Sequence, residues 1–309
     1  MNDKITISTH QLFAMFPDQE TARTYLESRL WPKGVRCPIC GLGDRIGVHS
    51  AGHYRCFQCK EAFTVRTGTV MERSHVPLHK WLYAMYLLVT ARKGIASLQL
   101  SKEIGITQKS AWFVLHRLRE ACGKNMDALR GIVEIDETYV GGIEANKHAS
   151  KKLRQGRGTV GKAAVLAMRE RGGRTLAFPV GDVDTKSVHT AIHTHVQAGT
   201  EIHTDDAGVY NGLDGLFFKH ETVNHSAGEY VRAGVTTNGV ESVFAVMKRG
   251  LHGVYHHASR KHLGRYVNEF AFRLNEGNVR TPTMTRLDAL IAATGADDPE
   301  QLESARRNA

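Results

Sequence analysis

Four of the five cysteines form two C-x2-C pairs. Cys37 and Cys40 make the first pair, Cys56 and Cys59 make the second, and 15 residues lie between the pairs. Each pair can offer two sulfur ligands to one tetrahedral ion, and this spacing is typical of a four-thiolate zinc ribbon. Four thiolates fill the coordination shell and leave no position for water, so we expect the zinc to be structural. Cys122 lies outside the pattern and is expected to pack in the protein.

Three carboxylates lie in the segment GIVEIDETYVGG, residues 131–142, which otherwise has the composition of a buried β-strand followed by a turn. Strand alternation places Glu134 and Asp136 on one face and Glu137 on the other. A buried carboxylate is costly without a partner, so we expect a solvent-exposed strand end, a basic partner or a metal ion to hold it. A strand with one solvent-exposed face is the simpler alternative.

Two further acids follow at the ends of predicted elements. Asp205 ends the strand-like segment TEIHTD, and Glu241, separated from it by 35 residues, lies in the first turn of the predicted helix TTNGVESVFAVMKRG. Asp206 follows directly, and we favour Asp205 because it ends the strand. Lys248 is seven residues after Glu241, two helical turns on, so both side chains lie on nearly one face of the helix.

The segment KGIASLQLSKEIGITQKSAWFVLHRLREAC resembles a helix-turn-helix. Residues 97–104 are predicted to form the first helix, GIT the turn, and Thr107 the N-cap of the second helix. The apolar stripe of the second helix consists of Trp112, Leu115, Leu118 and Cys122. Its opposite face offers Gln108, Lys109, His116, Arg117 and Arg119. The start of the second helix enters the major groove in such motifs, so we expect this face to contact DNA; a plain helical bundle is the alternative.

The charge balance also favours a polyanionic partner. The chain has 41 Lys and Arg against 31 Asp and Glu, a formal net charge of +10, and residues 1–130 alone hold 19 basic against 10 acidic residues. Basic segments bind nucleic acid because binding releases the counterions that are condensed on the nucleic acid. Near the ribbon, the side chains expected to face DNA are Tyr54, Arg55, Lys60 and Arg66. The basic, glycine-bearing stretch 144–161 is expected to be a mobile loop that contacts the DNA backbone through Lys151, Lys152, Arg154 and Arg157.

The N-terminal sequence MNDKITISTHQLF lacks the charged-then-apolar order of a signal peptide, and no apolar run has membrane-spanning length. We therefore expect a cytoplasmic protein without a membrane partner. In such a compartment the cysteines are expected to bind metal rather than form disulfides.

These side chains require a series of elements to position them. We expect a helical segment over residues 1–30, the zinc ribbon over 31–72, three helices including the helix-turn-helix over 73–126, a catalytic domain over 127–280 and a C-terminal tail over 281–309. Within residues 131–205 the pattern predicts three strands, a helix and another strand, and residues 238–276 return to helix.

The stretches CPICG…CFQC, VEIDETYVGG, HTDDAGVY, VNHSAGEYV, TTNGVESVFAVMKRGLHGVYHH and RYVNEFAFRLN resemble bacterial insertion-sequence transposases that join an N-terminal zinc ribbon to a DDE-type domain. The resemblance covers roughly residues 15–280. It implies an α+β multidomain chain in which the zinc ribbon and helix-turn-helix precede an α/β ribonuclease-H-like catalytic domain.

The resemblance also implies a site. Asp136, Asp205 and Glu241 would converge on two Mg²⁺ ions, with Mn²⁺ as a possible substitute, because carboxylate oxygens are hard ligands. Some relatives carry Asn as the third ligand, followed by a Lys, and this chain has Asn238 as well as Glu241. We favour Glu241 because a carboxylate is the better Mg²⁺ ligand. Lys248 and Arg249 would hold phosphates near the metals.

The implied activity is metal-dependent cleavage at transposon terminal inverted repeats, followed by strand transfer into target DNA. The expected partners are double-stranded DNA and further copies of the chain, as a homodimer or higher oligomer on DNA, in the bacterial cytoplasm at the nucleoid. Two alternatives remain: a structure-specific endonuclease on the same fold, and a zinc-ribbon DNA-binding regulator with an inactive core.

Overall fold

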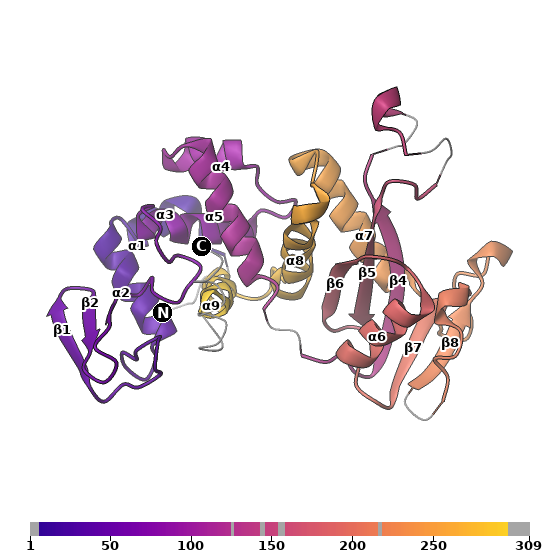
Figure 1. The fold of residues 1–309 in the computed structure, drawn as a ribbon, viewed down its shortest axis with the longest axis horizontal. Helices are drawn as coiled ribbons and strands as arrows, with labels where there is room; N and C mark the ends of the chain where they lie inside the picture. Colours follow the sequence, from indigo (N-terminus) through magenta and orange to yellow (C-terminus); the bar gives the residue numbers. More distant parts are fainter. Residues whose placement is uncertain (1–5, 125–126, 143–145, 154–157, 216–217, 296–309) are drawn as a thin grey trace. The chain divides into compact units, whose positions relative to one another are not determined.

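The computed structural model describes residues 6–124, 127–142, 146–153, 158–215 and 218–295 (Figure 1). The chain divides into two compact units, the first formed by residues 1–124 and 276–309 and the second by residues 125–275. No helix within the described ranges combines the length and the apolar character needed to cross a membrane.

The first unit contains a small three-stranded antiparallel sheet, in the order β1-β2-β3. Its strands are β1 (Ile46–Ser50), β2 (His53–Cys56) and β3 (Ala62–Phe63). Tyr54 on β2 stacks on Phe63 at a centroid distance of 5.5 Å and meets the edge of Trp31. The expectation that Tyr54 faces DNA is therefore wrong: alternation along β2 turns Tyr54 into this core and turns Arg55 to solvent.

The remaining described elements of the first unit are helical. They are α1 (Thr9–Met15), α2 (Gln19–Leu30), α3 (Leu78–Thr90), α4 (Ser97–Ile104), α5 (Gln108–Ala121) and α9 (Thr283–Thr294). Because α3 is apolar around most of its circumference, it is the central helix, and α9 packs against it. Part of the stretch expected to be a tail is thus a packed helix, in which Arg286 donates to the Val89 carbonyl at 2.9 Å.

The predicted helix-turn-helix is confirmed by α4 and α5. Gly105 ends α4 in the left-handed conformation, with φ of 58°, which costs glycine little. Thr107 then caps α5, because its Oγ1 accepts from the Ser110 N–H at 3.1 Å.

The second unit is built on a mixed five-stranded sheet in the order β6-β5-β4-β7-β8. The strands are β4 (Ile132–Val140), β5 (Ala163–Glu170), β6 (Thr175–Val180), β7 (Thr200–Asp205) and β8 (Phe218–Val223). β4, β5 and β6 are antiparallel neighbours, whereas β7 and β8 run parallel to β4. The predicted order of three strands, a helix and a strand is confirmed, as is the α/β architecture expected for this part of the chain.

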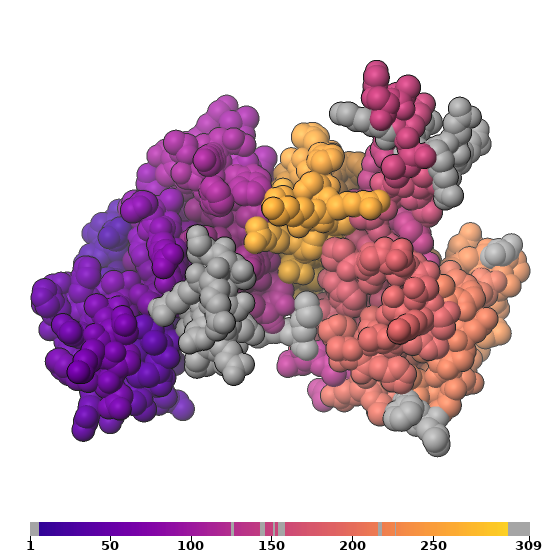
Figure 2. Space-filling view, viewed as in Figure 1, coloured from indigo at the N-terminus to yellow at the C-terminus, as the bar shows by residue number. Residues whose placement is uncertain are grey.

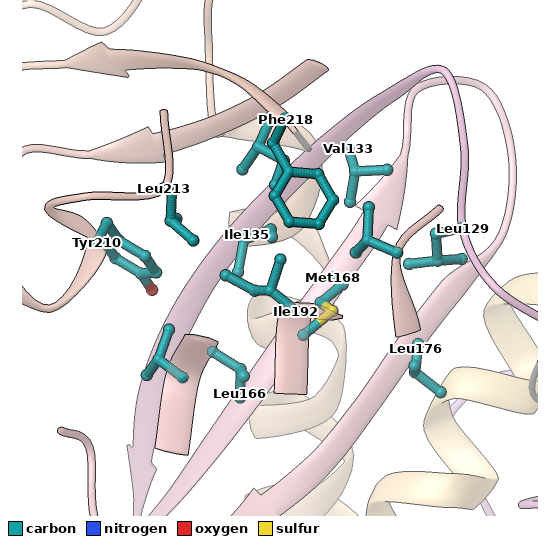
Figure 3. Packing of buried hydrophobic residues seen from close by; sticks show 13 residues of the cluster. Leu129, Val133, Ile135, Leu166, Met168, Leu176, Ile192, Tyr210, Leu213 and Phe218 are labelled. Atoms are coloured by element: carbon teal, nitrogen blue, oxygen red, sulfur yellow. The ribbon is translucent and has the colours of Figure 1, made fainter. Parts of the chain in front are cut away.

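Helices cover both faces of this sheet. On one face Val133, Ile135 and Met168 pack with α6 (Thr185–His195) in a hydrophobic cluster (Figure 3). On the other face Val165 and Ala167 pack with the remaining helices of the unit. Those helices are α7 (Asn238–Gly250) and α8 (Arg260–Glu276), joined in part by a π-helical turn at Leu251–Tyr255. Alternation along β4 therefore puts Glu134 and Asp136 on the face that α7 and α8 cover.

Candidate functional site

The four cysteines of the ribbon converge on one point. Their sulfur atoms all lie within 4.8 Å of one another, and both the Cys37–Cys59 and the Cys40–Cys56 Sγ–Sγ distances are 3.6 Å. A disulfide needs about 2.05 Å, whereas four thiolates around zinc at about 2.3 Å are roughly 3.8 Å apart. The sulfur spacing thus fits a tetrahedral ion and excludes disulfides among these residues.

Both cysteine knuckles have the same backbone design. The residue after the second cysteine has a positive φ in each, 74° at Gly41 and 62° at Lys60. Backbone N–H groups then point toward the sulfurs; those of Cys59 and Gln58 lower the pKa of the Cys56 thiol, whereas burial raises the pKa of the Cys37 thiol. A lowered pKa favours the thiolate, which is the form that binds metal. Lys60 is exposed, and its left-handed backbone conformation is unfavourable for a residue that has a Cβ atom.

The sheet of the second unit aligns Asp136 with Asp205. The parallel pairing of β4 and β7 sets Glu134 opposite His203, so two residues further along Asp136 stands level with Asp205 on the same face. Asp205 is the last residue of β7, and Asp206 beyond it is exposed.

Burial and neighbouring acids both affect the protonation of Asp136. Burial raises the pKa of Asp136 to about 7, and the negative charges of Glu137, Asp205 and Glu241 add to the rise. The Glu137 backbone N–H, which donates to Asp136 Oδ1 at 2.7 Å, acts in the opposite direction. A carboxylate crowded by like charges in this way is stabilised by a cation.

Glu241 reaches the cluster from the first turn of α7. Its Oε1 accepts from Thr237 Oγ1 at 3.3 Å and lies 3.4 Å from His225 Nε2, which also contacts Thr237 Oγ1 at 2.9 Å. Asn238 is exposed at the start of the same helix. Among the described residues, the four cysteines are the one group of three or more potential ligands within 4.8 Å of one another. The acids of the second unit are more widely spaced.

Several residues around the acids were not predicted to matter. Tyr210 Oη donates to Glu137 Oε2 at 2.6 Å on the opposite side of β4. Burial raises the pKa of the Tyr210 hydroxyl, so it stays a proton donor to Glu137. His225 and Thr237, which contact Glu241, belong to the loop before α7. The motif VNHSAGEYV contained His225, but only the folded chain shows which acid it contacts.

The basic residues predicted near the acids have mixed placements. Lys248 is half-buried and Arg249 is exposed on α7. Lys152 is exposed in segment 146–153, and Figure 2 shows the described part of this segment projecting from the body of the second unit. The side chain of Lys151 and the whole of Arg154 and Arg157 lie outside what the structure describes.

The predicted DNA-facing side chains of the first unit divide into two groups. Arg55, Lys60, Gln108 and Lys109 are exposed. Arg66 instead donates to the carbonyls of Ser74 and Val76, and Arg117 donates to those of Val70 and Glu72. His116 and Arg119 are buried, at 1% and 2% exposure.

Arg66, Arg117, His116 and Arg119 therefore act within the protein, and the prediction that they face DNA is wrong. Carbonyls of residues 70–76 accept from the Arg66 and Arg117 guanidinium groups, a contact that the sequence pattern did not indicate.

Comparison with known proteins gives two family matches. Residues 128–275 match the ISXO2-like transposase domain, and residues 17–62 match the transposase zinc-ribbon domain. An uncharacterized protein in transposable element ISH50 of Halobacterium salinarum is 30% identical over 292 residues, which cover 89% of this chain and 97% of that protein.

Among solved structures, a simian T-cell lymphotropic virus intasome with a PP2A regulatory subunit is 13% identical at a TM-score of 0.29, covering 62% of this chain and 65% of that one. The Mos1 strand transfer complex is 12% identical at a TM-score of 0.29, with 74% and 77% covered. Similarity at this level carries no structural argument.

Proposed function

Because this chain belongs to the family of ISXO2-like transposases with an N-terminal zinc ribbon, we propose that it binds the terminal inverted repeats of its element and catalyses metal-dependent strand cleavage and strand transfer into target DNA. One observation carries the proposal: Asp136, Asp205 and Glu241 come from two parallel neighbouring strands and the first turn of a helix, and the latter two raise the pKa of the first.

The residues present fit a pair of Mg²⁺ ions. They supply hard carboxylate oxygens, and their mutual repulsion at Asp136 is relieved by positive charge. When bound, the ions would activate the attacking oxygen and stabilise the leaving oxygen at phosphorus. Asp136 and Asp205 hold their ligand atoms on strands, which keep a site more accurately than loops do.

Neighbouring residues orient Glu241 and the adjacent carboxylate Glu137. Tyr210 fixes Glu137 on the far side of β4, and His225 with Thr237 orients Glu241. Lys248 and Arg249, further along α7, hold DNA phosphates beside the acids. Glu241 serves as the third ligand in this proposal, with Asn238 as a neighbour that contacts the substrate.

The first unit supplies DNA recognition. Lys109 and Gln108 at the start of α5 are exposed where a recognition helix contacts base edges, and Arg55 and Lys60 on the ribbon contact phosphates. Binding through phosphates requires no Mg²⁺ and weakens steeply as salt rises. Lys152 in segment 146–153 adds a contact from the second unit. Two or more copies of the chain assemble on the DNA ends.

The test is incubation of the chain with Mg²⁺ and a labelled duplex taken from the end of the element that encodes it. A transposase produces nicks at the end and joined products with target DNA. Cleavage without joining of pre-cut ends would indicate a structure-specific endonuclease. Salt-sensitive binding without any cleavage would indicate a DNA-binding regulator.

A further inference from the structure

Glu134 is a buried carboxylate that the site described above does not use. It lies on β4 two residues before Asp136, on the same face of the sheet, and is 3% exposed. A carboxylate at this depth needs hydrogen-bond partners that offset its lost hydration. The identity of those partners indicates its role.

The first partner is the beginning of α7. The Val240 N–H donates to Glu134 Oε2 at 3.1 Å. The helix passes so close that a Cβ on Gly239 would stand 2.5 Å from the same oxygen. Glu134 therefore contacts the turn that carries Asn238 and Glu241.

This contact replaces a local cap. In α2, α5 and α6 the N-cap residues Asp18, Thr107 and Asp184 accept hydrogen bonds from the first turn of their own helix. In α7 the N-cap residue is Thr237, and its side chain makes no capping hydrogen bond. Thr236 Oγ1 accepts from the Asn238 N–H at 3.2 Å, and the Val240 N–H is satisfied by a side chain from β4, whose negative charge also suits the positive end of the helix dipole.

The second partner is Arg171, from the turn between β5 and β6. Its Nη2 donates to Glu134 Oε1 at 3.2 Å and to His203 Nδ1 at 3.1 Å, and its Nη1 donates to the Gly234 carbonyl at 2.9 Å. The Thr236 N–H also donates to His203 Nδ1, at 3.3 Å. Arg171 and His203 thus hold the segment that leads into α7.

His203 has a defined tautomer in this arrangement. Its Nδ1 accepts from Arg171 and from Thr236, so its proton is on Nε2, which donates to Glu201 Oε1 at 2.9 Å. The ring is 1% exposed and fixed at both nitrogens.

We propose that Glu134 is a positioning residue for the catalytic site: together with Arg171 and His203 it fixes the first turn of α7, and so sets where Glu241 and Asn238 stand relative to Asp136 and Asp205. This inference rests on the proposed function of those acids. The groups that orient metal ligands typically affect metal affinity or activity by about 10- to 100-fold when they are replaced.

The test compares Glu134→Gln and Arg171→Ala with wild type in two measurements. The first is binding of Mn²⁺, followed by electron paramagnetic resonance, with Asp136→Ala identifying the site. The second is the Mg²⁺ concentration that gives half-maximal cleavage of the end duplex. We expect both variants to weaken Mn²⁺ binding and raise the Mg²⁺ requirement by about 10- to 100-fold, with cleavage recovering at high Mg²⁺.

Glu269→Gln is the matched control. Glu269 is 1% exposed and pairs with Arg273 at 2.6 Å on α8, so it is also a buried carboxylate with an arginine partner in the same unit. Glu269 contacts Arg273 and Tyr255, both of which lie outside the first turn of α7. This variant should lose stability but keep the wild-type Mn²⁺ affinity. The Arg171 side chain is 37% exposed, so Arg171→Ala still tests the proposal if Glu134→Gln does not fold.

Three results separate the possibilities. Wild-type Mn²⁺ affinity in both Glu134→Gln and Arg171→Ala overturns the proposal. Loss of Mn²⁺ binding in Glu134→Gln that no metal concentration restores, as in Asp136→Ala, makes Glu134 a ligand and also overturns it. If wild type binds Mn²⁺ but never cleaves DNA, the proposed function fails, while weaker Mn²⁺ binding in both variants still supports the positioning role.

Discussion

In the ribbon, four sulfur atoms from two local knuckles lie within 4.8 Å of one another, whereas the acids of the second unit come from two strands and a helix and stay further apart. A neutral thiol can approach its neighbours before any metal arrives. Carboxylates at the same spacing repel one another, and burial together with such repulsion raises the pKa of Asp136.

This difference is expected if the ribbon holds a structural ion and the acids form the proposed catalytic site. Four thiolates close the coordination shell of a structural ion, so nothing else needs to enter. A catalytic site must leave room for the phosphate and for the attacking and leaving oxygens. The first kind is built by a short stretch of sequence, whereas the second depends on elements far apart in the chain. The experiments below test this contrast, beginning with the largest expected effect.

Replacing one sulfur should disable the whole ribbon. Cys59→Ser is expected to reduce zinc from one ion per chain to none and to unfold the ribbon, because apparent zinc-binding energies of roughly 10–16 kcal/mol stabilise such folds. DNA binding should weaken while the second unit stays folded. Elemental analysis and a DNA-binding assay measure these effects. Cys122→Ser, which is outside the ligand set, should keep its zinc; wild-type protein purified without chelator and free of zinc would refute the assignment.

Replacing one acid should remove chemistry and leave the fold. Asp136→Ala, Asp205→Ala and Glu241→Ala are each expected to lower cleavage and joining by about a thousandfold or more, because each removes an oxygen ligand worth several kcal/mol at the transition state. Zinc content and DNA binding should be retained. Asp206→Ala is the neighbouring control and should stay active. Full activity of Asp136→Ala would refute the catalytic assignment, and Asp136 would then only belong to the polar face of a strand.

The crowded acid should make metal binding depend on pH. Below about pH 7 Asp136 holds a proton that the metal must displace, so the apparent Mg²⁺ affinity should fall by roughly tenfold per pH unit there. Stability of the metal-free protein has the opposite trend. It should decline from about pH 4 to 7, because the folded state keeps a proton that the unfolded chain releases near its ordinary value.

Mn²⁺ titrations and melting temperatures between pH 5 and 8 measure these two trends. Asp136→Asn should flatten the pH dependence of stability, because it cannot ionise. A wild-type profile that matches that of Asp136→Asn would show that Asp136 does not titrate in this range.

A smaller effect is expected from the substitution that tests which residue is the third metal ligand of the acidic site. Asn238→Ala should slow cleavage only about fivefold, the value of one hydrogen bond of about 1 kcal/mol, if Glu241 is the ligand. Single-turnover cleavage rates at saturating Mg²⁺ provide the measurement. The reverse outcome, an inactive Asn238→Ala with an active Glu241→Ala, would assign the third position to Asn238.

The smallest expected effect concerns Lys60 in the zinc ribbon. Lys60 occupies the left-handed position that Gly41 fills in the other knuckle. Lys60→Gly should stabilise the ribbon by about 1 kcal/mol and, through the lost charge, reduce the salt dependence of DNA binding by about one counterion. Lys60→Asn, which also tolerates this conformation, separates the charge from the strain. An unchanged salt slope in both variants would remove Lys60 from the DNA contacts.

The sequence by itself determined the features that depend on local spacing. The four cysteines, the turn between α4 and α5 and the N-cap Thr107 were all predicted, because each involves residues close together in the chain. The residue types of the acids and the alternation of β4 indicated a site, although their assignment as metal ligands stays a prediction.

Only the tertiary structure decided how distant segments meet. The β4–β7 register sets Asp136 level with Asp205, and residues 70–76 turn Arg66 and Arg117 away from solvent. The cap of α7 by Glu134 joins residues 106 positions apart. No local pattern encodes these pairings, because a strand register or a helix contact is selected by packing of the whole unit, and a side chain's role follows from the partner that this packing brings to it.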